Sequence, residues 1–378
     1  MTKEDCSVDI VRDFASLSLQ RSDKFTQALE SINFTIFNSV HNLGYYMWNE
    51  EGDIKNLTEV TCEDIITRLT LDAQPPLAVD SRVLNKNIQQ FKMTLDPQEF
   101  DSSFPHASTY LPCLYAAKEK GLDLSTIDFV FGGSTLDFLA TKSTSKDKFI
   151  VTKIPGTKIA LVVKYDPYVI DYSDPSSQFK RLVQGKKYED KYNGESFEHL
   201  HVIDIGGFKV LFSSQADAID KNGSTVDVKT SIPNWWNTTI AFQMISNGSV
   251  SLYHAERLPK KFGHTLLNVS VLDLQTVMRN GVADSVKKQK RNWRAQIGVK
   301  ERRTRIKELE HNVLSSLILL KKNMNSGKYE NEAGTSQVLS IIFDEDGKME
   351  LNPRGIEIGD LFPSSDVMDD LLSKTETD

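Results

Sequence analysis

The sequence predicts an α/β fold of the α+β kind, with a mixed, largely antiparallel sheet flanked by helices. Two observations carry this prediction. Short apolar runs that are rich in β-branched residues follow one another across tight turns, as 149–152 and 159–163 do. Longer segments, such as 300–323, instead repeat apolar residues every three to four positions. We expect one domain over 1–365, with its chemistry in a core of about 105–260, and an acidic, disordered tail over 366–378.

The elements follow in order along the chain. Residues 63–71 fit a helix, and Leu111–Lys120 fits a second one that ends at Gly121. The apolar run Ile127–Phe131 is a strand that runs into a glycine turn. Ser177–Asn193 is predicted to be a helix, with Glu189 continuing its apolar stripe. Strands over 199–205 and 208–213 meet at Gly206-Gly207, and a late strand covers 338–343.

Composition narrows the class of protein. A net charge of −7 argues against a protein that binds duplex nucleic acid over its whole surface, but it allows a local basic groove. Ten Lys or Arg residues against one acid lie between Lys287 and Lys307, so positive charge is concentrated there. Within this stretch, residues 287–291 fit a nuclear localisation signal, an RNA contact or an ordinary basic surface. Three scattered cysteines exclude a disulfide framework. Without a signal peptide or a long apolar stretch, we expect no secretion and no membrane partner.

Two carboxylates and a lysine form the most informative pattern in the chain. Strand alternation in 225–230 directs Asp227 and Lys229 to one face, and the turn residues 221–224 return the chain so that Asp217 stands beside Asp227. An acid followed about ten residues later by acid-x-lysine is the form of the PD-(D/E)xK nuclease core. The alternative for these residues alone is a solvated ion pair on an exposed strand.

Further motifs share the order and approximate spacing of a known family. The segments 127–133, 159–164, 185–189, 212–217, 225–231 and 241–243 occur as they do in the decapping exoribonucleases, which the chain resembles over about 105–260. The resemblance implies a PD-(D/E)xK-like core and a metal-dependent hydrolase that removes pyrophosphate, an incomplete cap or an NAD cap from RNA 5′ ends. It also implies 5′-3′ degradation of the RNA, a role in RNA quality control, and a nuclear location, with the cytoplasm as the alternative.

The resemblance also implies roles for residues. Mg²⁺ or Mn²⁺ would be held by Glu189, Asp217, Asp227 and the backbone carbonyl of Val228. Lys229 and Gln243 would act with the two aspartates on the attacking water and the scissile phosphate. Substrate would contact Gln215, Lys186 and Lys187. Independently of the resemblance, Lys180 and Arg181 are further candidate cations for an RNA backbone, and the alternative for these basic residues is a solvated helix face. The expected partners are triphosphate, incompletely capped or NAD-capped RNA ends, with a 5′-3′ exonuclease as a candidate protein partner.

The chain also departs from the family pattern. Gly133 stands where the family has a phosphate-binding arginine, and Gln215 and Asp227 replace two glutamates. The interval from Lys229 to Gln243 is short, which makes the Gln243 assignment the least secure. These departures predict weakened activity and keep two alternatives open: a catalytically impaired relative that binds RNA ends or a partner exonuclease, and a DNA-acting nuclease. The pair His199 and His201 has metal-ligand spacing, but the favoured interpretation is two surface side chains.

Overall fold

The computed structural model describes residues 24–49, 60–88, 99–101, 110–143, 149–165, 169–171, 175–186, 195–231, 236–258, 265–292, 294–330 and 336–373. Its strands are β1 (Phe37–Asn49), β2 (Leu69–Leu71), β3 (Glu99–Asp101), β4 (Phe129–Phe131), β5 (Phe149–Lys153), β6 (Ala160–Lys164), β7 (Val169–Asp171), β8 (Glu195–Ile205), β9 (Phe208–Gln215), β10 (Ala218–Ile219), β11 (Thr225–Ser231), β12 (Ser251–Arg257), β13 (Leu266–Asp273), β14 (Leu339–Phe343) and β15 (Met349–Pro353).

Its α-helices are α2 (Cys62–Ile66), α3 (Ser81–Asn87), α4 (Tyr110–Glu119), α5 (Thr135–Thr141), α6 (Pro175–Val183), α7 (Thr238–Ser246), α8 (Leu274–Gln289), α9 (Val299–Met324) and α10 (Ser365–Leu372). Short 3-10 turns lie at Leu124–Thr126 and Ile358–Asp360, and residues 24–31 are also helical. None of the helices in these ranges is long and apolar enough to cross a membrane.

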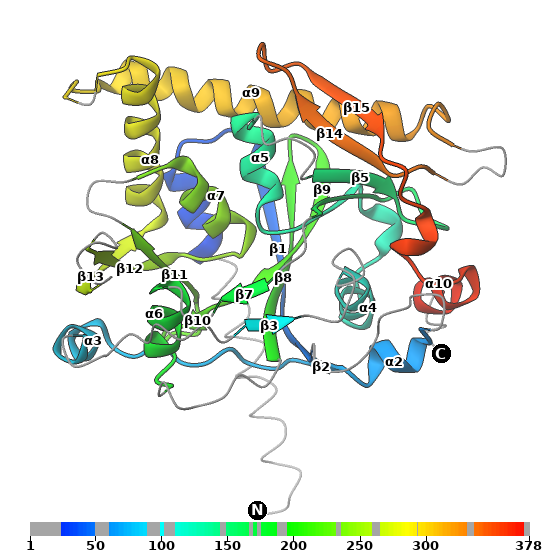
Figure 1. Cartoon of the computed structure of the whole chain (residues 1–378), viewed down its shortest axis with the longest axis horizontal. Coiled ribbons are helices and arrows are strands. Elements are labelled where there is room, and N and C mark those ends of the chain that lie inside the picture. The colour runs from blue at the N-terminus through cyan, green and yellow to red at the C-terminus, as the bar shows by residue number, and fades with distance from the viewer. Residues whose placement is uncertain are drawn as a thin grey trace, which may run out of the picture.

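Two sheets organise the described strands. The larger has the order β15-β14-β5-β6-β4-β9-β8-β1-β2, and the smaller has the order β10-β11-β12-β13 (Figure 1). Most neighbours are antiparallel, while β4 runs parallel to β6 and β9, and β11 runs parallel to β12. The predicted mixed, largely antiparallel sheet with flanking helices is therefore confirmed. β3 and β7 pair with each other.

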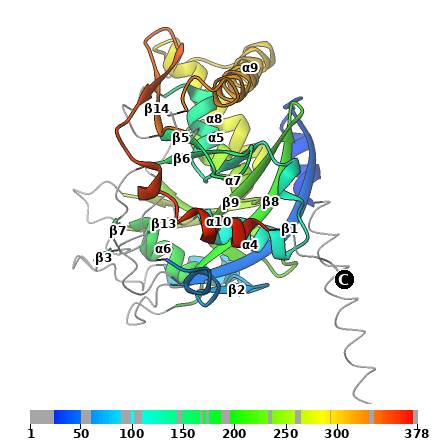
Figure 2. The same cartoon turned by 90° about the vertical axis from the view of Figure 1, so that its right-hand side faces the viewer.

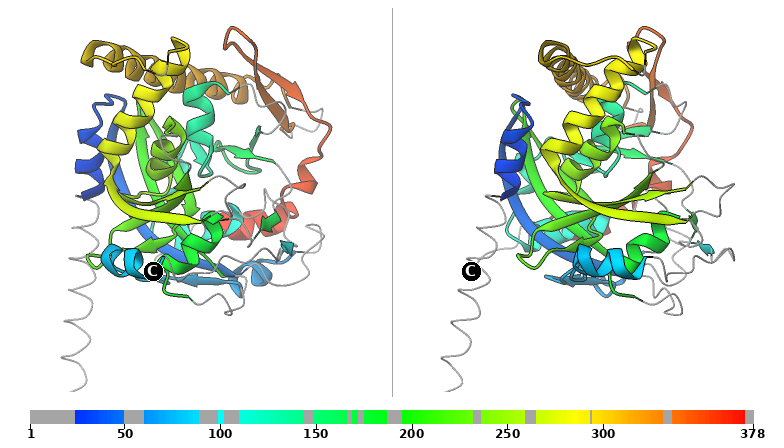
Figure 3. Two further views of the ribbon diagram at one scale, coloured as in Figure 1. Left: turned by 60° about the vertical axis from the view of Figure 1, so that its left-hand side comes forward. Right: turned by 90° about the vertical axis from the view of Figure 1, so that its left-hand side faces the viewer.

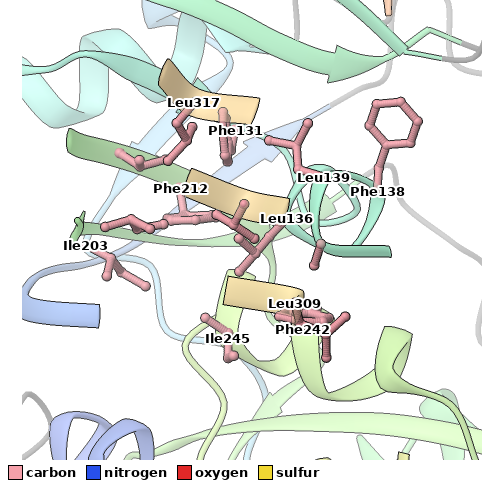
Figure 4. Close-up of a cluster of buried hydrophobic side chains, with 14 of the residues drawn as sticks. Phe131, Leu136, Phe138, Leu139, Ile203, Phe212, Phe242, Ile245, Leu309 and Leu317 are labelled. Atoms are coloured by element: carbon pink, nitrogen blue, oxygen red, sulfur yellow. The ribbon is translucent and has the colours of Figure 1, made fainter. Parts of the chain in front are cut away.

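Helices cover the larger sheet on both faces (Figure 2). On one face, α5, α7, α8 and α9 enclose a core that includes Phe131, Phe212, Phe242, Leu309 and Leu317 (Figure 4). On the other face, α4 packs with α2 and α10 over residues such as Leu161, Leu200 and Leu211. Burial of these large apolar side chains on both faces fixes the sheet as a rigid support for whatever its strand ends carry.

A third cluster positions the smaller sheet. Val226 and Val228 of β11 point towards α6, where they pack with Phe179 and Val183. Leu84 of α3 completes this layer. The apolar face of β11 is thus anchored by α6 and α3, which leaves the alternate residues of the strand on the opposite face.

Three predicted elements are wrong in part. The helix predicted over 177–193 ends at Val183, because Gly185 adopts a left-handed φ of 69° and the Lys186 amide bonds back to the Arg181 carbonyl. This is the glycine-terminated helix end that satisfies the last free carbonyls. Residues 63–71 form the short helix α2 and then the strand β2.

The acidic tail predicted from Asp366 is also wrong in part. It contains α10, because Met368 faces the core beside Phe362 and is buried there. The free energy gained by burying one apolar stripe of such a helix outweighs the tendency of the acidic residues on its other face to keep the segment disordered.

Candidate active site

The Asp217–Asp227 pair is built by a hairpin. β10 and β11 pair antiparallel, with Ala218 opposite Val226. Extending that register by one pair sets Asp217 opposite Asp227. The connecting turn is closed by the Asp220 side chain, which accepts the amides of Asn222 and Ser224 at 2.8 Å each. The predicted turn and the predicted neighbouring aspartates are thus both present in the structure.

One backbone amide joins the two carboxylates. The Val228 amide donates to Oδ2 of Asp217 at 2.9 Å and to Oδ1 of Asp227 at 3.1 Å. Both aspartates are buried, with exposed fractions of 6% and 1%. Two buried carboxylates that share a single amide are a costly arrangement unless cations neutralise them.

Two lysines supply that neutralisation. Nζ of Lys229 lies 3.1 Å from Oδ1 of Asp227, and Nζ of Lys180 on α6 lies 2.7 Å from Oδ1 of Asp217. Gln184, just past the end of α6, donates to the Asp217 backbone carbonyl at 2.8 Å. The site is therefore a compact group of two carboxylates and two ammonium groups at the β10–β11 edge of the smaller sheet, to which α6 contributes Lys180.

The two carboxylates differ in pKa. Burial raises the pKa of Asp227, and the neighbouring Asp217 charge adds to this, although Lys229 opposes both. Burial also opposes ionisation of Asp217, but Lys180 and Lys229 together outweigh it and hold the pKa of Asp217 below its usual range. Oδ2 of Asp227 is buried and has no hydrogen-bond partner among the described residues. An uncompensated carboxylate oxygen of this kind is a ready ligand for a hard cation.

No protein-family model matches the chain, and no curated protein matches it by sequence. Solved structures do match. Dxo1 from K. lactis in complex with manganese is 11% identical, with a TM-score of 0.55, and the match covers 86% of this chain and 94% of that one. Rai1 from Scheffersomyces stipitis is 10% identical, with a TM-score of 0.52 and coverage of 90% and 94%.

The chain has the Rai1/Dxo1 fold. A third match, Rai1 from Candida albicans in complex with pU5-Mn²⁺, has a TM-score of 0.51 at 10% identity and covers 88% of this chain and 95% of that one. The resemblance to the decapping exoribonucleases that the ordered motifs predict is confirmed at the level of the fold. Identities this low carry the fold only, so the chemistry must be argued from the residues.

Within the Rai1/Dxo1 fold, the predicted site residues are only partly brought together. Asp217, Asp227 and Lys229 converge as predicted. Glu189 and Lys187 lie outside the described residues. The prediction that Glu189 continues the apolar stripe of this helix is wrong, since α6 ends at Val183. In the described ranges, no group of three or more His, Cys, Asp or Glu side chains converges, so a third carboxylate for the metal stays a prediction.

The remaining predicted residues surround this centre without joining it. Gln243 is half-buried on α7, in the crossover between β11 and β12, and no hydrogen bond between described residues links its side chain to the aspartates or Lys229. Gln215 is exposed at the end of β9, and Lys186 is half-buried just past α6. A metal-binding role for the Val228 carbonyl also stays a prediction. At Gly133, an added Cβ would lie 2.5 Å from Oγ of Ser214.

Sequence reasoning missed two features of the site. Lys180 contacts Asp217 directly, a contact that depends on how α6 docks. His199 and His201 are buried, not on the surface, with exposed fractions of 3% and 0%. His199 Nε2 lies 2.9 Å from Oδ1 of Asn42, and Nδ1 lies 3.0 Å from the Asn247 carbonyl.

His199 belongs to a polar layer behind β11, whereas His201 packs between the rings of Phe25 and Phe212. The hydroxyl of Tyr45, whose ring contacts His199, lies 2.7 Å from Oγ1 of Thr225, two residues before Asp227 on the same face. A cavity of about 10 Å³, room for one water, lies among these side chains. This layer holds β11 in place from the side opposite α6.

Proposed function

We propose that this protein is a divalent-metal-dependent hydrolase that acts on RNA 5′ ends. The observation that carries the proposal is the buried Asp217–Asp227 pair, flanked by Lys229 and Lys180, at the start of the smaller sheet of a Rai1/Dxo1 fold. Paired carboxylates with an adjacent lysine hold a cation and a phosphate at the same place, which is the requirement of phosphodiester and pyrophosphate hydrolysis. The reaction would release pyrophosphate, an incomplete cap or an NAD cap, with 5′-3′ degradation as a further activity.

The bound groups in the solved neighbours support this substrate class. The Candida albicans Rai1 structure contains pU5-Mn²⁺, and a Scheffersomyces stipitis Rai1 structure contains (3′-NADP)⁺ and calcium ion. The K. lactis Dxo1 structure contains manganese. These ligands support RNA or a dinucleotide 5′ end as substrate and a divalent cation as the metal. We propose Mn²⁺ or Mg²⁺ for this chain. We also propose a nuclear location.

The donor set fits a hard divalent cation. Asp217 and Asp227 offer carboxylate oxygens, one of which, Oδ2 of Asp227, has no hydrogen-bond partner in the part of the chain that the structure describes. Glu189 and the Val228 carbonyl complete the proposed set. A divalent cation here would withdraw charge from the phosphate and lower the pKa of a bound water. Its binding would compete with Lys180 for Oδ1 of Asp217.

Side chains and one backbone amide of the protein have the remaining roles in binding and orienting the substrate. Lys229 is 31% exposed at its side chain, so its ammonium can reach a phosphate oxygen while it still neutralises Asp227. The Val228 amide holds the two carboxylates in a fixed orientation, so that little reorganisation is needed when substrate binds. Gln243 is proposed to orient the nucleophile, and Gln215, Lys186 and Lys187 to line the path of the RNA.

An end-release assay tests the proposal. The purified protein is incubated with 5′-triphosphate, NAD-capped and unmethylated-cap RNA in Mg²⁺ or Mn²⁺, beside Asp217→Ala, Asp227→Asn and Lys229→Met variants. Each variant should lose at least about 100-fold in rate, since each removes a charge that acts on the reacting phosphate. Asp220→Ala, which alters only the turn, should retain the chemistry. No release from any RNA by the wild type would overturn the enzyme proposal.

A second candidate is a catalytically impaired relative that binds RNA ends or a partner exonuclease. Gly133 favours it, because the position that matches the family's phosphate-binding arginine carries no side chain, and the Ser214 hydroxyl occupies the adjacent space. RNA-end binding without release would support this candidate. Hydrolysis of single- or double-stranded DNA in preference to RNA would instead identify a DNA-acting nuclease.

A further inference from the structure

The corner between α8 and α9 carries a dense positive charge that the proposed site does not use. We define the basic corner as residues 284–308, which hold ten Lys or Arg and three acids. The local charge is therefore +7 in a chain whose total is −7, so the rest of the chain carries −14. A charge distribution this uneven attracts a polyanion to one place on the molecule.

All three acids of the basic corner are already paired. Lys287 pairs with Asp284 at 3.2 Å, Lys290 pairs with Glu301, and Arg305 pairs with Glu308 at 2.7 Å. Seven cations remain without an acid partner among the described residues: Lys288, Arg291, Arg294, Lys300, Arg302, Arg303 and Lys307. Because the three acids are already paired, the counterions of these seven cations come from solution. A polyanion such as a nucleic acid can take the place of those counterions.

Three of the free cations form a regular row. Lys300, Arg303 and Lys307 occupy positions i, i+3 and i+7 of α9 and are all exposed, so they lie along one outward face. Two further charges, Lys288 and Arg291, lie exposed at the end of α8 beside them. A row of guanidinium and ammonium groups on a rigid helix suits the repeating phosphates of a nucleic acid strand.

The placement of the corner connects it with the proposed site. β13 pairs with β12, which pairs with the β11 strand that carries Asp227. α8 starts directly after β13 and rises to the corner, as Figures 1 and 3 show. Its 16 residues span about 24 Å, within reach of a short length of RNA whose 5′ end lies at the aspartates.

We propose that the basic corner binds the backbone of single-stranded RNA, at a distance from the Asp217–Asp227 site. This inference rests on the proposed function, because it takes RNA as the polyanion. A nuclear import signal is the competing use of these residues. The structure favours RNA, since Lys287 and Lys288 lie within α8 and Lys290 is tied to Glu301, whereas import receptors need an extended, unpaired peptide.

The test measures equilibrium binding of a 5′-hydroxyl single-stranded RNA of about 30 nucleotides to the full chain at several salt concentrations. The variant K300E/R303E/K307E reverses the exposed row. K158E/K322E/K348E reverses three exposed charges elsewhere and matches its change in net charge. We expect binding by the row variant to be at least about tenfold weaker than by the control variant near 0.1 M salt, with a salt slope lower by about 2.

Equal affinities and equal slopes for the two variants would overturn the inference. Equal RNA affinities together with loss of import-receptor binding only in the row variant would also overturn it, in favour of the transport signal. Far-ultraviolet circular dichroism and urea unfolding of both variants would confirm that α9 remains folded. Because the probe has no 5′ phosphate or cap and is bound without a divalent metal, it is not hydrolysed by the proposed activity, and the result is independent of the end-release assay, which tests the proposed function by itself.

Discussion

Replacing Lys180 with methionine separates a metal site from a structural ion pair. In the folded protein, Nζ of Lys180 lies 2.7 Å from Oδ1 of Asp217, and the two side chains are 22% and 9% exposed. At an effective dielectric constant of about 20, two unit charges at this separation attract by about 6 kcal/mol. The cost of taking both charges from water consumes much of this, and losing one member of a buried pair typically costs about 3–5 kcal/mol.

We therefore expect K180M to lower the free energy of unfolding by about 3 kcal/mol without metal, measured by urea titration at pH 7. Mn²⁺ should recover most of this loss. In the wild type an entering cation must displace Lys180 from Oδ1 of Asp217, whereas in K180M no ammonium group competes for that oxygen. The variant should thus bind Mn²⁺ more tightly, and the stabilisation by Mn²⁺ should be larger for K180M than for the wild type.

A matched control removes an ion pair outside the site. K287M breaks the Lys287–Asp284 pair, whose side chains are 28% and 11% exposed, so it should also cost about 3 kcal/mol, but with no change in the Mn²⁺ effect. Isothermal titration of Mn²⁺ into all three proteins completes the comparison. If Mn²⁺ stabilises K180M no more than it stabilises the wild type, the Asp217–Asp227 pair does not form a metal site that competes with Lys180.

Two further predictions concern the support of the site. Gly248→Ala should lower the free energy of unfolding by about 2–4 kcal/mol, because its Cβ would lie 2.3 Å from Cε1 of His199 at a φ of 67°. Gly207→Ala is the control: its φ is 93° but its Cβ would meet open space, so it should cost only about 1 kcal/mol. Equal losses in urea unfolding would contradict this prediction. Burial raises the pKa of Asp137 to about 6, although Thr239 opposes it, so the folded state binds more protons than the unfolded state and stability falls as pH rises from about 4 to 6. Asp137→Asn should remove up to about 3 kcal/mol of this fall, and parallel stability curves for the two proteins between pH 4 and 7 would refute it.

The sequence was most informative where chemistry is local. Alternation in β11 and the turn after Asp220 are set by neighbouring residues, so the approach of Asp217 to Asp227 could be predicted. The early end of α6 could also have been predicted from the sequence. Gly185 is a helix-ending glycine like Gly121, which ends the helix predicted over Leu111–Lys120.

The rest of the site depends on contacts between distant segments. The Lys180–Asp217 pair exists because α6 packs on β11, and no local pattern encodes that docking. The burial of His199 likewise depends on Asn42 of β1 and on the backbone of Asn247, which only the folded chain brings to it. Periodicity assigns a residue to a face of its strand, but it cannot say what covers that face.

The close approach of Gly133 to Ser214 makes these two positions epistatic. An arginine introduced at position 133 must displace the Ser214 hydroxyl, which lies where its Cβ would begin. The same arginine meets less resistance once glycine has replaced Ser214, so the two substitutions are non-additive and their order matters. A lineage with Gly133 and Ser214 therefore acquires an arginine at position 133 most readily by changing Ser214 first, a step that by itself adds no positive charge.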